Sequence, residues 1–114
     1  MNEAASRIAI IDFEASALPG KGRRSFPIEV GAAVPKTGEV RSWLIRPERV
    51  WLDEWDWYYE SEQVHRLTRE HLLRCELPRE QVAREMQGFI GGRALLSDNP
   101  AAEGYWFGLL YSEE

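Results

Sequence analysis

Two acidic residues near the start of the chain have the spacing for metal chemistry. The apolar run RIAII at 7–11 leads directly into Asp12-Phe13-Glu14. Side chains two residues apart in a strand point to the same face. Adjacent carboxylates repel each other unless a positive charge lies between them. Hard divalent cations prefer carboxylate oxygen. The pair therefore predicts a Mg²⁺ or Mn²⁺ site, against the plainer interpretation of two ordinary acids in a common tripeptide.

A third acid, Glu103, lies about one turn inside the last predicted helix. A short predicted strand comes just before that helix. If this strand lies beside the strand of Asp12, the start of the helix lies over the same end of the sheet. Glu103 would then join Asp12 and Glu14 at one site. The alternative is a solvated acid that interacts with the positive end of the helix dipole.

The sequence predicts one α/β domain over residues 1–114. The strands and helices that must position these acids follow the order β-β-β-α-α-β-α. Apolar and β-branched runs place strands at 7–13, 28–34, 40–45 and 94–96. A turn sequence, Lys36-Thr37-Gly38-Glu39, joins the second and third strands. The first three strands are therefore expected to form an antiparallel meander, with the fourth strand in addition.

Helices are expected on both sides of the fourth strand. The clearest runs over 78–90, with Pro78 at its first position and Gly91-Gly92 after its end. The last runs over about 101–111, with Asn99 as cap and Pro100 at the first position. Residues 61–74 are helical in character and broken near Thr68, which caps a second turn. Residues 49–60 are expected to be an ordered connector that covers the sheet edge.

Composition narrows the class of protein without deciding its function. The chain has a net charge of -5, whereas general nucleic-acid binders are usually basic. A metal-dependent nuclease, however, gathers carboxylates that its ions neutralise. No apolar stretch reaches the ~20 residues of a membrane span, and the start of the chain is not a signal peptide. With Cys75 as its single cysteine, the protein is expected in the reducing cytoplasm.

In their order, four stretches resemble the DEDDh-type 3'-5' exonucleases, named for four acids and a catalytic His. The matching stretches are IIDFEAS at 10–16, PIEVG at 27–31, VHRLT at 64–68 and SDNPAAE at 97–103. The resemblance implies a ribonuclease-H-like mixed sheet with flanking helices. It implies two-metal hydrolysis of phosphodiester bonds at the 3' ends of single-stranded DNA or RNA, with Mg²⁺ or Mn²⁺ as cofactor.

The resemblance also implies roles for individual residues. Asp12, Glu14 and Glu103 would be the catalytic, metal-binding acids. Substrate contacts would come from the residues around them, namely Phe13, Ala15, Ser16 and Asn99.

The chain departs from the family pattern at two places. Glu103 stands where the family has Asp, and Ala102 where it has a bulky apolar residue. The family's last strand and helix, which carry the general-base His and the fourth acid, have no expected counterpart before Glu114, and His65 matches a structural position instead. We therefore expect a domain that is incomplete at its C-terminal end, with impaired metal binding and turnover.

Two alternatives stay open. One is a catalytically inactive module on the same fold that binds nucleic acid or protein, with a second copy or a partner chain covering the truncated sheet. The other is an interaction protein unrelated to nucleic acid, in which the acids are incidental. No membrane partner is expected.

Two further clusters have both a functional and a structural interpretation. Lys21, Arg23 and Arg24 would contact substrate phosphates or form a solvated loop, and the loop is favoured. Trp51, Trp55 and Trp57 would stack on bases or pack against the sheet or an oligomer partner, and packing is favoured.

Overall fold

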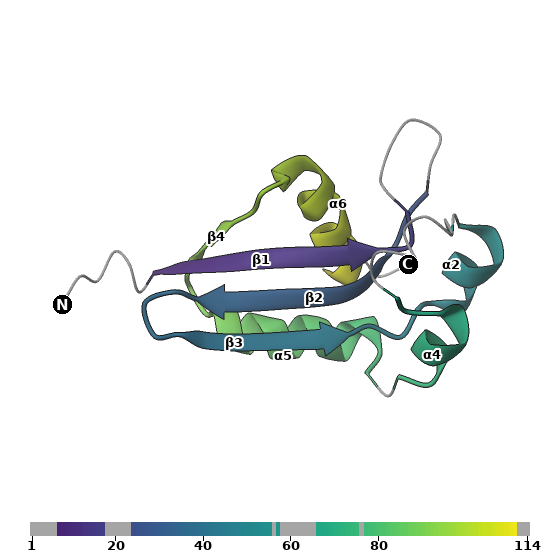
Figure 1. Ribbon diagram of the computed structural model, residues 1–114, viewed down its shortest axis with the longest axis horizontal. Coiled ribbons are helices and arrows are strands. Elements are labelled where there is room, and N and C mark those ends of the chain that lie inside the picture. The colour runs from purple at the N-terminus through teal and green to yellow at the C-terminus, as the bar shows by residue number, and fades with distance from the viewer. Residues whose placement is uncertain (1–6, 18–23, 56, 58–65, 76, 112–114) are drawn as a thin grey trace.

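A computed structural model describes residues 7–17, 24–55, 57, 66–75 and 77–111. Its centre is one mixed sheet in the order β3-β2-β1-β4 (Figure 1). Strands β1 (Ile8–Ala15), β2 (Pro27–Val34) and β3 (Glu39–Leu44) pair antiparallel, and β4 (Ala94–Leu96) pairs parallel with β1. The predicted meander and the predicted extra strand are both confirmed.

The turn between β2 and β3 forms where the sequence predicted it. Gly38 has φ 79°, a left-handed conformation that glycine adopts without steric cost. Its backbone N–H donates to the carbonyl oxygen of Val34 over 2.9 Å. The turn fixes the register of the hairpin, which pairs Val34 with Glu39 and Gly31 with Ser42.

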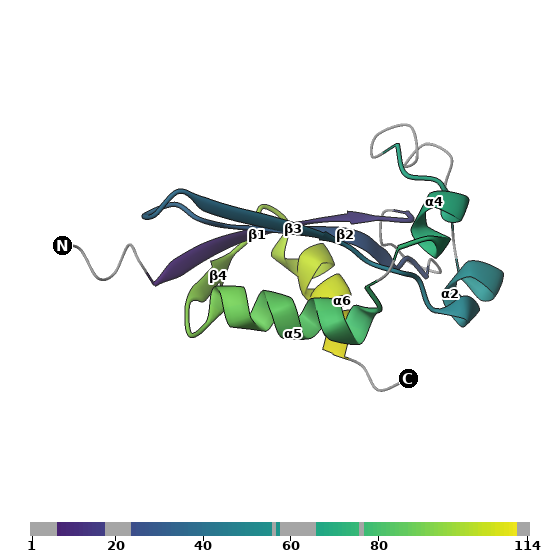
Figure 2. The same cartoon turned by 90° about the horizontal axis from the view of Figure 1, so that it is seen from below.

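Four helices complete the described structure: α2 (Arg49–Glu54), α4 (Arg69–Leu73), α5 (Arg79–Ile90) and α6 (Pro100–Tyr111). Helices α5 and α6 lie together under one face of the sheet, and no helix lies along the middle of the other face in the part of the chain that is described (Figure 2). The main core forms between that sheet face and the two helices. Within the described residues, no helix is long and apolar enough to cross a bilayer.

The helix predictions hold with three corrections, the first of which is that Arg66, inside the predicted helical stretch 61–74, has φ 60° and is not helical. Thr68 caps α4 as expected, since its hydroxyl accepts from the backbone N–H of His71 over 3.1 Å. Gly91 ends α5 with φ 61°. Pro78 is the extended cap of α5 and not its first helical residue. Residues 49–54 of the predicted connector form the helix α2. The predicted helical residues 61–65, and most of the connector after residue 55, lie outside the described residues.

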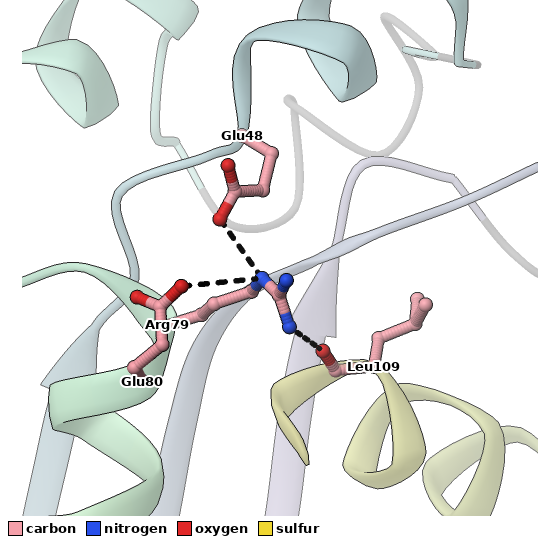
Figure 3. A network of polar contacts seen from close by, with 4 residues as sticks. All are labelled: Glu48, Arg79, Glu80 and Leu109. Atoms are coloured by element: carbon pink, nitrogen blue, oxygen red, sulfur yellow. Dashed lines mark hydrogen bonds and ion pairs between the residues drawn. The ribbon is translucent and has the colours of Figure 1, made fainter. Parts of the chain in front are cut away.

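Arg79 ties three separate segments together at one end of the helical layer (Figure 3). Its side chain is only 3% exposed. Its Nε donates to Glu48 over 2.9 Å, and Nη1 donates to the carbonyl oxygen of Leu109 over 2.9 Å. A cation suits a carbonyl near the C-terminal end of a helix because of the helix dipole. Arg79 thus fixes α6 relative to α5, and with it the helix that carries Glu103.

Candidate functional site

Asp12 and Glu14 lie on the sheet face opposite α5 and α6. Burial alternates along β1: Ile11, Phe13 and Ala15 are buried against the helices, whereas Asp12 is exposed and Glu14 half-buried. This is the pattern of a strand with one covered and one open face. The sequence-based expectation that the two acids share a face, with Phe13 on the other, is confirmed.

Glu103 reaches the same part of β1 from the first turn of α6. The parallel pairing of β4 with β1 ends at Leu96, opposite Ile10, and the chain then turns into the helix. Asn99 starts that helix, accepting from the backbone N–H of Ala102 over 3.4 Å. Glu103 is 4% exposed. Strands β1 and β4 are neighbours in the sheet. This is the condition under which the sequence predicted that Glu103 would lie near Asp12 and Glu14.

Both oxygens of the Glu103 carboxylate accept hydrogen bonds from the protein. Oε2 accepts from the backbone N–H of Phe13 over 2.6 Å. Oε1 accepts from the hydroxyl of Ser97. The Ser97 hydroxyl oxygen in turn accepts from the backbone N–H of Asn99 over 3.1 Å. The carboxylate thus bridges the central strand and the loop that leads into α6.

The acids influence one another's pKa. Burial, and then repulsion by Asp12, Glu29 and Glu103, raises the pKa of Glu14 above its usual value. Burial also raises the pKa of Glu103, as do hydrogen bonding to Asp12 and repulsion by it, while the bonds from Ser97 and Phe13 act in the opposite direction. The charged carboxylates are therefore unfavourable together, which is the setting in which a cation would be bound.

Glu29 is a member of this group that the sequence reasoning did not single out. It lies directly opposite Glu14 in the pairing of β1 with β2. Like charges placed opposite each other in a sheet are destabilising. The stretch PIEVG contains Glu29, but its place beside Glu14 depends on the strand register. Only a prediction of that register would have identified Glu29 as a neighbour of Glu14.

The fit to a metal ion is partial. Asp12 and Glu14 supply the hard oxygen donors that Mg²⁺ and Mn²⁺ prefer. Within the described residues, however, no group of three His, Cys, Asp or Glu side chains is arranged to hold an ion. Both oxygens of Glu103 are already engaged by protein donors. The arrangement therefore does not amount to a complete three-acid centre.

The residues expected to contact substrate are mostly buried. Phe13, Ala15 and Ser16 face the interior, and the Ser16 hydroxyl accepts from the backbone N–H of Phe26 over 3.0 Å. Asn99 is exposed at the start of α6. Substrate contact stays a prediction for all four residues, and for the first three it would have to be made through the backbone.

The aromatic cluster packs inward. Trp51 is buried and stacks on Phe26 with ring centroids 5.5 Å apart. Trp55 and Trp57 pack against the same group, and the guanidinium of Arg24 lies 4.8 Å from the centroid of the Trp55 ring. These contacts agree with the packing interpretation. Lys21, Arg23 and His65 lie outside the described residues, and His71 lies in α4 with an exposed side chain.

The fold is similar to that of solved exonuclease I structures. Exonuclease I from E. coli, in complex with a dT13 oligonucleotide, matches with a TM-score of 0.68 at 11% identity, over 91% of this chain and 23% of that one. A moderately thermophilic exonuclease I from Methylocaldum szegediense matches with a TM-score of 0.65 at 13% identity, over 84% of this chain and 21% of that one. The chain has an exonuclease I-like fold.

The exonuclease I-like fold is what these comparisons establish, since identities of 11% and 13% carry no residue-level correspondence. No protein-family model matches the sequence, and no curated protein matches it. The chain spans less than a quarter of the length of these exonuclease I structures. The mixed four-stranded sheet with flanking helices that was expected from the sequence is confirmed.

Proposed function

We propose that this chain is a nuclease-type domain of the DEDDh 3'-5' exonuclease kind, which binds the 3' ends of single-stranded DNA or RNA. The observation that carries the proposal is the position of Asp12 and Glu14 on the open face of β1, the strand between β2 and β4 in an exonuclease I-like sheet. A site on an open sheet face at the end of a central strand is accessible to an extended polymer. Residues 1–114 would form one such domain, acting in the cytoplasm.

In this proposal Asp12 and Glu14 hold Mg²⁺ or Mn²⁺. A bound divalent ion would supply activated water and neutralise the charge that develops on the phosphate. The chain's own contribution is two anionic oxygen donors on a rigid strand, with a Glu14 pKa raised by burial and by neighbouring acids. Neutralising that group of charges is the physical reason for an ion to bind there.

Turnover is expected to be slow. The one histidine among the described residues, His71, lies in α4 and not in β1, β4 or α6, which carry the acids. Histidine, the most frequent general base, is absent from the described residues of the acid group. Loss of such a base typically costs about 10²–10⁴-fold in rate.

A second candidate function is a catalytically inactive binding module on the same fold. The engaged oxygens of Glu103 favour it, because they commit one of the three acids to contacts within the protein. A row of paired residues across the open sheet face, Val40, Ala33, Ile10 and Leu96, also favours it. Val40 is 71% exposed, Ile10 43% and Leu96 52%. A contiguous exposed apolar patch is one mark of a contact site for a second copy or a partner chain.

The experiment that separates the two uses a single strand labelled at its 5' end, incubated with the chain and Mn²⁺. Stepwise shortening from the 3' end that disappears in Asp12→Ala supports the exonuclease. Binding that requires Mn²⁺ and Asp12, without shortening, supports the inactive module. The matched control is Asp53→Asn, because Asp53 is an exposed acid on α2. A wild-type chain that neither binds nor shortens the strand would remove both proposals.

A further inference from the structure

We propose that Glu103 is a positioning residue and not a third metal ligand. Its carboxylate takes the place of a neighbouring strand at the edge of β1 and fixes the stretch that carries Asp12 and Glu14. The effect of this positioning on a bound ion rests on the proposed function. The structural role of Glu103 does not, since it follows from contacts within the protein alone.

The edge of β1 creates the need for such a residue. Strand β4 is three residues long, and its pairing with β1 ends at Ile10. Beyond Ile10, no described strand lies along that edge of β1. The backbone N–H of Phe13 therefore has no strand carbonyl to receive it there, and a buried amide without an acceptor is unfavourable. Glu103 supplies the acceptor, with 2.6 Å between the Phe13 nitrogen and Oε2.

The second oxygen of Glu103 fixes the other end of the bridge. The Ser97 hydroxyl donates to Oε1, and Ser97 directly follows the last residue of β4. The backbone N–H of Glu103 donates to the carbonyl oxygen of Asn99 over 2.9 Å, which holds the residue in the first turn of α6. The Glu103 carboxylate thus connects β1 to the segment that follows β4, beyond the point where the two strands stop pairing.

The same contacts argue against metal binding by Glu103. Each oxygen of this carboxylate accepts a charge-assisted hydrogen bond, and these two bonds orient the group toward β1 and Ser97. Among the described residues, no set of three His, Cys, Asp or Glu side chains that includes Glu103 is arranged to hold an ion. Its side chain is also almost closed to solvent, at 4% exposure. The Glu103 side chain reaches from the first turn of α6 to the backbone amide of Phe13 in β1.

Two measurements on the full chain test the inference, one of them independent of any metal. Amide hydrogen exchange, followed by NMR, reports on the Phe13 N–H. In Glu103→Gln the side-chain oxygen can still accept, so the protection of Phe13 is expected to stay within about threefold of wild type. In Glu103→Ala it is expected to fall by about tenfold or more relative to other β1 amides, because local opening no longer breaks a hydrogen bond. If Glu103→Ala does not fold, Glu103→Asp, whose shorter side chain cannot reach the Phe13 amide, carries the same expectation.

The second measurement is Mn²⁺ affinity by calorimetric titration. Glu14→Gln is expected to weaken binding by about tenfold or more, in line with the loss of a metal-site residue, and Glu103→Gln by no more than about threefold. Equal losses in the two variants would overturn the inference, as would unchanged Phe13 protection in the shortened variants. A wild-type chain that binds no Mn²⁺ would count against the proposed function only, since amide exchange would still decide the role of Glu103.

Discussion

The backbone N–H of Phe13 and the carboxylate of Glu103, 90 positions apart in the chain, are joined by a hydrogen bond of 2.6 Å. The bond connects the central strand to the last helix at the point where β4 stops pairing with β1. Asp12 and Glu14 flank Phe13, so their backbone is held from the same point. The geometry of Asp12 and Glu14 therefore depends on the Phe13–Glu103 hydrogen bond, in which neither of these two acids takes part.

The pH dependence of stability should reflect the crowding of these acids. Glu14 and Glu103 have pKa values raised above the usual 4.5. A raised carboxyl pKa favours the protonated form in the folded state. The resulting stability is fully present below the unfolded value and is lost as the pH rises through the folded value. In the absence of metal, Tm should therefore rise as the pH falls from 7 toward 5.

The matched variant for this pH prediction is Glu14→Gln combined with Glu103→Gln. It removes both titrating groups and should flatten the melting profile over the same interval. Divalent ions in excess should also flatten the wild-type profile if they neutralise the pair. A Tm that falls steadily from pH 7 to 5 in the wild type would show that other carboxylates dominate the linkage.

Substitution of Arg79 should be among the most damaging changes outside the acid group. Arg79→Ala removes a buried cation bonded to Glu48 and to the carbonyl oxygen of Leu109. Such a loss should lower the free energy of unfolding by about 2–4 kcal/mol, since charge-assisted partners are left without a donor. Arg84→Ala, an exposed arginine on the same helix, should change it by less than about 0.5 kcal/mol. Urea unfolding followed by tryptophan fluorescence measures both.

The buried pair of Ser25 and Trp106 gives a third prediction. The indole N–H of Trp106 donates to the Ser25 hydroxyl over 2.9 Å, and both side chains are buried. Ser25→Ala leaves that N–H without an acceptor, which should cost about 1–3 kcal/mol of unfolding free energy. Ser42→Ala is the control, because Ser42 is exposed on β3. Equal unfolding midpoints for the two variants would contradict the bond.

The sequence was informative where a local pattern decides the structure. The alternation of RIAIIDF put Asp12 and Glu14 on one face of β1, and the Asn99-Pro100 pair located the start of α6. It was less informative for Arg49–Glu54, a helix of six residues with no side-chain cap, which packs through Trp51. Short helices of this kind are stabilised by tertiary contacts and carry little local signal.

The remaining features depend on distances between segments. That Glu29 lies opposite Glu14 follows from the register of two strands separated by a loop of unspecified geometry. The engagement of Glu103 follows from β4 being short enough to leave the Phe13 amide without a strand partner. Sequence patterning placed Glu103 near Asp12 but did not indicate that both of its oxygens would be used by the protein.

We propose that Asp12 and Glu14 together hold a divalent ion on an exonuclease I-like sheet. Calorimetric titration of Mn²⁺ into the wild-type chain and into Asp12→Asn combined with Glu14→Gln, with Asp53→Asn as control, tests this proposal. We predict saturable binding in the wild type and the control, and loss of that binding in the double variant. Equal Mn²⁺ affinity in all three proteins, or none in any, would contradict the claim.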